Sequence, residues 1–167
     1  MSDSSNSTAI YLLRTVQQHH VQLSVMADQK ANFLLAASFV TLSILIGYGA
    51  THRITASLIS IGLFTITASI FAILTIMPSY KLNDRRNIQT NPLFFGDFAQ
   101  ESVENYLNRM TPVLESDAKI FELMLRDIHS MGKVLLKKKY RYLSWSYRIF
   151  LVGLVVSPLI WIVEKLT

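Results

Sequence analysis

Three long apolar runs divide the chain, at residues 31–50, 54–77 and 145–163, and a long polar segment separates the second run from the third. A run of about 20 apolar residues matches the roughly 30 Å hydrocarbon core of a bilayer at 1.5 Å per helical residue. The third run holds Arg148 near its start and Pro158 inside, and a membrane helix tolerates proline where its neighbours satisfy the freed carbonyl group. We therefore predict three transmembrane helices.

Helical periodicity also runs through the polar segment, residues 78–144. Apolar side chains recur at i, i+3, i+4 and i+7 in the set Val103, Tyr106, Leu107 and Met110. A longer stripe with the same spacing includes Phe121, Met124, Leu125, Ile128, Met131 and Leu135. The fold class predicted from these patterns is an all-α integral membrane protein with a helical domain inserted between the second and third spans.

A helix start is expected at Thr111 and Pro112, because threonine is a good N-cap and proline suits the first helical position. No proline follows until Pro158, so one helix is predicted to pass from this point into the third span, as far as Ser157. The expected organisation is an N-terminal helical segment at 1–30, a transmembrane hairpin at 31–77, a sensing domain at 78–144 and a third transmembrane helix at 145–164.

Basic residues set the expected orientation of these spans. The connector between the first two runs carries one fixed positive charge, Arg53, whereas residues 78–144 carry eleven lysines and arginines against eight acids. Lysine and arginine near the ends of spans stay in the cytoplasm. The N-terminus and residues 78–144 are therefore predicted to be cytoplasmic.

Composition narrows the functional classes. Hydrophobic residues make up 51% of the chain and charged residues only 16%, which is unusual for a soluble domain. The absence of cysteine excludes disulfides, thiolate catalysis and cysteine-bound metals. No hydrolase, nucleotide-loop or dinucleotide motif occurs, and the four histidines lack metal-ligand spacing, so neither an enzyme nor a cofactor is expected. The basic pI of about 9.6 follows from the membrane topology, and no nucleic-acid partner is needed to explain it.

The entry to the first span, ADQKAN, offers a first candidate site. Asp28 and Lys30 stand where the cytoplasm meets the lipid headgroups. The simpler interpretation is an interfacial anchor in which Lys30 reaches phosphate and Asp28 offsets its charge. The alternative is a polar ligand site or gate at the mouth of the membrane domain.

A second candidate is the loop NPLFFGDF. Asn91, Phe94 and Phe95 follow two arginines, Arg85 and Arg86. Aromatic rings can stack on a base and arginines can bind a phosphate, so the loop is a candidate nucleotide site. Phenylalanines of this kind are more often core or interface anchors.

The third candidate is the basic cluster KKKYRY at 137–142, which leads into an aromatic belt. Its simpler interpretation is attraction to anionic membrane lipid. One member, Lys139 or Arg141, could instead face inward and bind a phosphate. Arg126, further up the same predicted helix, completes the basic candidates for ligand binding.

Three stretches in this order resemble a known family. They are ADQKANFLL at the first span, NPLFFGDF after the second, and the segment from Leu123 to Tyr140 that contains DIHSMGKVL. Together, over roughly residues 23–154, they resemble the transmembrane effectors of Pycsar antiphage defence. The resemblance implies that a cyclase makes cyclic UMP or cyclic CMP on phage infection. The effector then damages the bacterial inner membrane and halts growth, an abortive infection.

Two functional hypotheses remain. The first is a ligand-gated, homo-oligomeric effector that forms pores or disrupts the bilayer, with a small anionic ligand bound in a basic pocket shared between subunits. The alternative is a constitutive membrane scaffold whose basic cytoplasmic domain binds a protein partner, without nucleotide gating.

Overall fold

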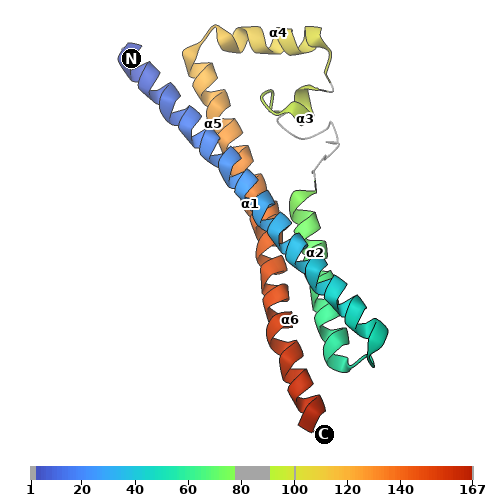
Figure 1. Ribbon diagram of the computed structural model, residues 1–167. Helices are drawn as coiled ribbons and strands as arrows, with labels where there is room; N and C mark the ends of the chain where they lie inside the picture. The colour runs from blue at the N-terminus through green and yellow to red at the C-terminus, as the bar shows by residue number, and fades with distance from the viewer. Residues whose placement is uncertain (1–2, 78–90, 100, 167) are drawn as a thin grey trace. The chain divides into compact units, whose positions relative to one another are not determined.

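A computed structural model describes residues 3–77, 91–99 and 101–166, and within these ranges all regular structure is helical. The elements are α1 (Asp3–Thr51), α2 (Ala56–Ile76), α3 (Phe95–Phe98), α4 (Val103–Leu114), α5 (Asp117–Val134), the π-helix η1 (Leu135–Tyr140) and α6 (Arg141–Leu166) (Figure 1). The all-α fold expected from the sequence is confirmed.

Three stretches of helix are long and apolar enough to cross a membrane. They are Asn6–Thr51, Ala56–Ile76 and Asp117–Leu166. The first and third contain the apolar runs at 31–50 and 145–163, and the second lies within the run at 54–77. The third is continuous through α5, η1 and α6. The structure therefore supports three spans.

Contacts divide the chain into two compact units. Unit 1 comprises Met1–Gln22 and Pro78–Val134, and unit 2 comprises Leu23–Met77 and Leu135–Thr167. The limits drawn from hydropathy, at 30 and 144, lie later on both helices. The difference arises because polar residues just before the apolar runs, Ser24 and Lys139 among them, bind one another within unit 2.

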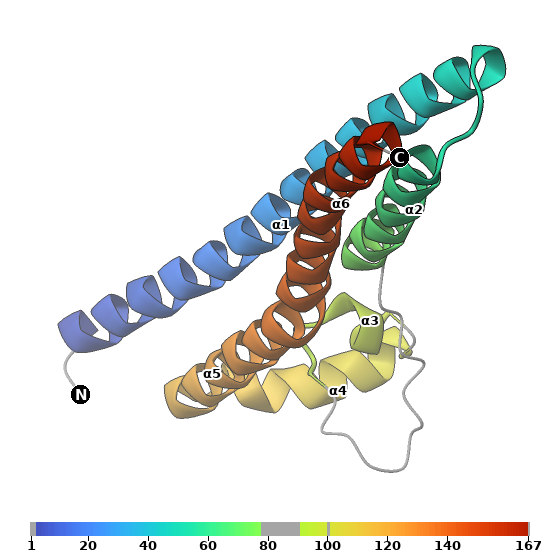
Figure 2. The same ribbon diagram turned by 90° about the horizontal axis from the view of Figure 1, so that it is seen from below.

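In unit 2, α2 and α6 pack against each other in opposite directions (Figure 2). Ser146 Oγ donates to the carbonyl of Ala68 at 2.7 Å, and further along Ser157 Oγ lies 3.3 Å from Ser60 Oγ. At the end of α6 the carboxylate of Glu164 accepts from the first backbone N–H of α2, at 2.7 Å. The two helices are therefore antiparallel.

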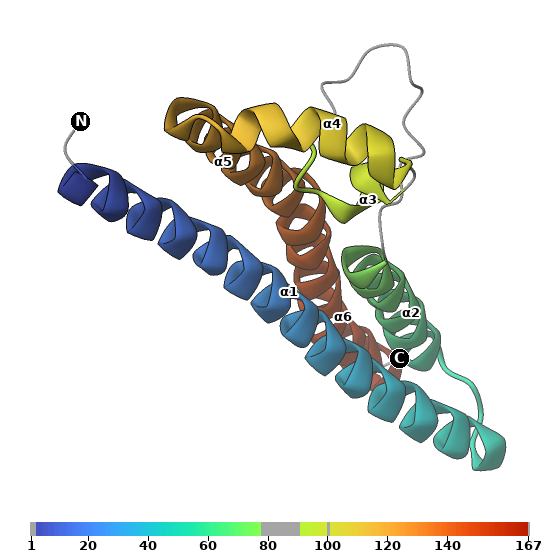
Figure 3. The same ribbon diagram turned by 90° about the horizontal axis from the view of Figure 1, so that it is seen from above.

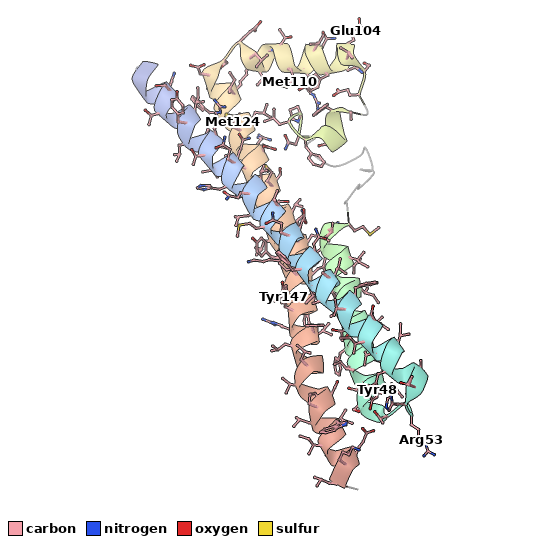
Figure 4. All side chains as sticks on the ribbon, viewed as in Figure 1. Tyr48, Arg53, Glu104, Met110, Met124 and Tyr147 are labelled. Atoms are coloured by element: carbon pink, nitrogen blue, oxygen red, sulfur yellow. The ribbon has the colours of Figure 1, made fainter. Side chains whose placement is uncertain are left out.

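The second part of α1 runs in the same direction as α6. Tyr140 Oη donates to the carbonyl of Leu23 at 3.3 Å, and Tyr147 Oη donates to that of Lys30 at 3.0 Å. The chain therefore enters unit 2 at Leu23, leaves it at Met77 and re-enters at Leu135 at one end of the bundle. Figure 4 shows Tyr48 and Arg53 together at the hairpin that joins α1 to α2.

Small side chains predominate in the interior of unit 2, and most large apolar ones face outward. The buried cluster contains Ala27, Ala31, Leu34, Ala68, Ala72 and Leu143, and buried hydroxyl groups join it from Ser38, Thr65, Thr75 and Ser146. By contrast Phe33, Phe39 and Ile46 are about three-quarters exposed, at 73–74%. Small residues allow close approach of membrane helices, and an apolar exterior suits a lipid solvent. This distribution is that of a membrane bundle.

In unit 1, α4 and α5 join at a short corner (Figure 3). The predicted helix start at Thr111 and Pro112 is wrong, since both residues lie inside α4. Ser102 is the N-cap instead, and its hydroxyl group accepts from Asn105 N at 3.2 Å. Pro112 stands in the last turn of α4, where it cannot donate the i to i−4 hydrogen bond of a helix interior, and α4 ends two residues later, at Leu114. The long helix therefore begins at Asp117 and not at Pro112.

Candidate functional site

An ion pair between α1 and η1 is the most strongly connected polar site in unit 2. Lys139 Nζ lies 2.7 Å from each carboxylate oxygen of Asp28 and 2.7 Å from Ser24 Oγ. The Lys139 side chain is 19% exposed and that of Asp28 is 32% exposed. Two candidates that the sequence placed 111 residues apart are thus in direct contact.

All three lysines of the triplet lie on the π-helix η1, and they make different contacts. In η1 the backbone bonds from i to i+5, so its side chains follow a wider turn than in an α-helix. Lys138 Nζ donates to the carbonyl of Met77, the C-cap of α2, at 2.8 Å. An ammonium group is favoured there by the negative end of the helix dipole. Lys137 stays exposed.

Two lysines thus connect η1 to both neighbouring helices, Lys139 to α1 and Lys138 to α2. Lys138 precedes the third apolar run, and burial together with the neighbouring ammonium group of Lys139 lowers the pKa of Lys138. The arrangement connects η1 to α1 and α2 at this end of unit 2.

The remaining candidates of unit 2 lie at its surface. The side chains of Lys30 and Arg141 are exposed, and Lys30 takes part through its carbonyl group, which accepts from Tyr147. The guanidinium carbon of Arg148 lies 6.0 Å from the centre of the Trp145 ring, within the range of a cation–π contact. These side chains fit the interfacial anchoring expected for a basic and aromatic belt.

Unit 1 has a separate polar network centred on Asp127, a buried carboxylate that is 8% exposed. Its oxygens accept from Gln17 Nε2 of α1 at 2.8 Å and from Asn91 Nδ2 at 2.7 Å. Asn91 also donates from its backbone N–H to Asp97 Oδ2 at 2.7 Å and accepts from Leu93 N at 3.0 Å. Asn91 therefore fastens the NPLFFGDF loop to α5.

Other sequence candidates of unit 1 are less enclosed. Arg126 pairs with Glu122 one turn earlier, at 2.6 Å, and both side chains are at least half exposed. Phe94 is 44% exposed. Arg85, Arg86 and the side chain of Phe95 lie outside the described residues, so an arginine-covered aromatic loop stays a prediction.

The ten candidates thus fall into two groups. Asn91, Phe94 and Arg126 lie in unit 1, and Asp28, Lys30, Lys139 and Arg141 lie in unit 2; the other three are the ones not described. In the part of the chain that the structure describes, no three histidine, aspartate or glutamate side chains gather as a metal site would require.

Sequence reasoning missed Ser24, Gln17 and Asp127. A signal for Asp127 was present, because it falls three residues after Met124 and four before Met131, on the apolar stripe of α5. A carboxylate on such a stripe requires hydrogen-bond donors from a neighbouring element. His20, also missed, lies beside Gly132, and its buried Nδ1 has no hydrogen-bond partner among the described residues.

Comparison with known proteins gives one match. The family described as "Pycsar effector protein domain" matches residues 11–164, which is nearly the whole chain. No curated protein and no solved structure matches the chain.

Proposed function

This chain belongs to the Pycsar effector family, and from that membership we propose that a cyclic mononucleotide, cyclic UMP or cyclic CMP, activates it to impair the bacterial inner membrane. The family and the three apolar helices support the broader description, a transmembrane effector of antiphage defence. The proposal adds the activating ligand, the oligomeric response and the loss of membrane integrity.

The observation that carries the proposal is the packing of unit 2. Its interior consists mainly of alanines and hydroxyl side chains with a few leucines, while most of its large apolar side chains face outward. Small residues let membrane helices pack closely in a bilayer. Unit 2 is accordingly the output part, which opens a path or disturbs the bilayer when several copies associate.

Unit 1 is the sensing part in this proposal. The connections at Leu23, Met77 and Leu135 leave the same end of unit 2, which agrees with one cytoplasmic location for residues 1–22 and 78–134. The ligand is a small anion with a pyrimidine ring. Arg86 and Arg126 are the proposed hydrogen-bond donors to its phosphate, and Phe94 is the proposed stacking surface for its base.

Oligomerisation couples binding to activity. A pocket shared between subunits binds its ligand only when the subunits associate, so ligand binding favours the associated state by the same free energy. The uninterrupted helix from Asp117 to Leu166 then carries a rotation from the sensing part into the third span.

Equilibrium binding to the full chain in lipid nanodiscs tests the sensing claim. Radiolabelled cyclic UMP and cyclic CMP should bind the unmodified protein, and Phe94→Ala combined with Arg86→Ala should abolish binding while membrane insertion persists. The matched control is Phe39→Ala with Arg53→Ala, which removes the same chemical groups from exposed positions of unit 2. Failure of both nucleotides to bind the unmodified protein would favour the constitutive scaffold.

A further inference from the structure

The Lys139–Asp28 pair has more partners and less exposure than an ordinary surface ion pair. Lys139 Nζ has three oxygens at 2.7 Å, two from Asp28 and one from Ser24. An exposed pair between two mobile side chains contributes little because it gives up side-chain entropy in a high dielectric. Lys139 is only 19% exposed, and its three N–H groups all have acceptors, so this pair holds η1 against α1.

The pair also stands on an unusual piece of backbone. Among the described helices η1 alone is a π-helix, and it occupies six residues between α5 and α6. π-helices are rare, occur mostly as short insertions in α-helices and are often found at functional sites. Because the i to i+5 pattern is intrinsically less favourable than α, contacts outside the helix must hold η1 in place.

Two of those contacts are the lysine interactions, and a third is the hydrogen bond from Tyr140 Oη to the carbonyl of Leu23. Lys139 binds α1 through Asp28 and Ser24, and Lys138 binds the C-terminal carbonyl of α2 at Met77. Asp28 and the two lysines lie within a few residues of the points where the two long helices pass between the units, after Gln22 and after Val134. A change of helix register in η1 alters the direction in which every side chain of α6 points, because α6 follows η1.

We propose that the Lys139–Asp28 pair is a latch that holds η1 in its π conformation and keeps unit 2 in its resting packing. When the pair opens, η1 returns to α-helical bonding. The register of α6 then shifts by one residue, a rotation of about 100° at 3.6 residues per turn. This rotation moves the small-residue face of α6 away from α2 and exposes the buried hydroxyl groups at Ser146 and Ser157.

The latch rests on the proposed function in one respect only, namely that the active state makes membranes permeable. It does not depend on which nucleotide activates the protein. A variant without the latch should be active with no ligand present, so the decisive measurement is made without nucleotide. The response of the unmodified protein to nucleotide is a separate measurement.

The experiment uses the full chain in dye-loaded liposomes of phosphatidylethanolamine and phosphatidylglycerol, with no nucleotide added. Lys139→Met should raise the leakage rate about tenfold or more, which corresponds to about 1.4 kcal/mol in favour of the open state. Lys137→Met is the matched control, because it removes the same charge from the exposed neighbour on the same π-helix. It should leak at the rate of the unmodified protein.

A charge exchange separates a lost latch from a lost fold. Asp28→Lys combined with Lys139→Asp restores an ion pair of opposite polarity and should return leakage to near the resting rate. Hydrogen exchange of the amides at 135–140 should accelerate in Lys139→Met and return toward normal in the exchanged protein.

Two results would overturn the latch. One is Lys139→Met liposomes that remain as tight as those with Lys137→Met. The other is leakage that the charge exchange does not reduce, since the effect would then be misfolding. Neither result bears on nucleotide binding to unit 1, so the proposed function and the latch fail separately.

Discussion

Gly153 of α6 lies directly against Phe64 of α2, so closely that a Cβ atom built on Gly153 would be 2.5 Å from the Cβ of Phe64. A contact of that length is not tolerated, and a Cβ cannot swing aside as the end of a flexible side chain can. The two helices therefore approach at a distance that only glycine permits at this position.

Replacing Gly153 by alanine should destabilise unit 2. The added methyl group forces α2 and α6 apart, and overpacking of this kind costs about 1–3 kcal/mol. Circular dichroism during thermal unfolding in detergent should show a lower midpoint for Gly153→Ala. Gly47→Ala is the control, since nothing lies within 4 Å of a Cβ there. Equal midpoints for the two variants would show that α2 and α6 are not in this close contact.

Ser146→Ala should weaken the same helix pair by a smaller amount. The substitution removes the 2.7 Å hydrogen bond to the carbonyl of Ala68 without adding volume. Interhelical hydrogen bonds in membrane proteins contribute about 0.6 kcal/mol on average. Ser43→Ala, at an exposed position of α1, provides the comparison in the same unfolding assay. If Ser146→Ala were as stable as Ser43→Ala, the buried hydroxyl group would have no stabilising role.

Asn91→Ala should release the NPLFFGDF loop from α5. The variant loses the bond from Nδ2 to Asp127 and the bond that Oδ1 accepts from Leu93 N, and leaves a buried carboxylate short of a donor. An unsatisfied buried group costs about 1–3 kcal/mol, and more when charged. Hydrogen exchange at the Leu93 amide should become faster. Asn108→Ala, on an exposed position of α4, should leave that rate unchanged; a similar change in both variants would contradict the role of Asn91.

The three spans were predictable from the sequence because each apolar run is by itself long enough to cross the hydrocarbon core of a bilayer. Helix boundaries were less so. Thr111 and Pro112 have the right chemistry for a helix start, yet Ser102 begins α4 nine residues earlier and the chain turns only after Leu114. Local propensity could not decide between two acceptable caps, since the corner depends on how α4 and α5 pack.

The candidate site was predictable only in part. Asp28 and Lys139 were each expected near the membrane surface. The sequence could not single out Lys139, because residues 137, 138 and 139 are all lysines with the same charge. All three lie on the π-helix, and nothing in LLKKKY distinguishes that conformation from an ordinary α-helix. Asn91 was singled out for a ligand, and in the structure its amide binds Asp127.

The absence of cysteine makes orientation directly testable, because any introduced cysteine is the only thiol in the chain. Arg53→Cys lies in the hairpin between α1 and α2, and Asn108→Cys lies on α4; both positions are exposed. With a cytoplasmic N-terminus, a membrane-impermeant maleimide should label Arg53→Cys in cells whose outer membrane has been opened, and label Asn108→Cys only after lysis. The reverse labelling pattern would invert the topology.

Leakage of dye from liposomes that contain the unmodified protein tests the central claim most directly. Cyclic UMP or cyclic CMP at micromolar concentration should cause rapid dye release, and protein-free liposomes with the same nucleotides should stay intact. Cyclic AMP, cyclic GMP and the linear 5′-monophosphates serve as specificity controls. Leakage triggered by a cyclic pyrimidine nucleotide is the result that a gated membrane effector predicts. Liposomes that remain sealed with every nucleotide, while the protein is correctly inserted and folded, would contradict it.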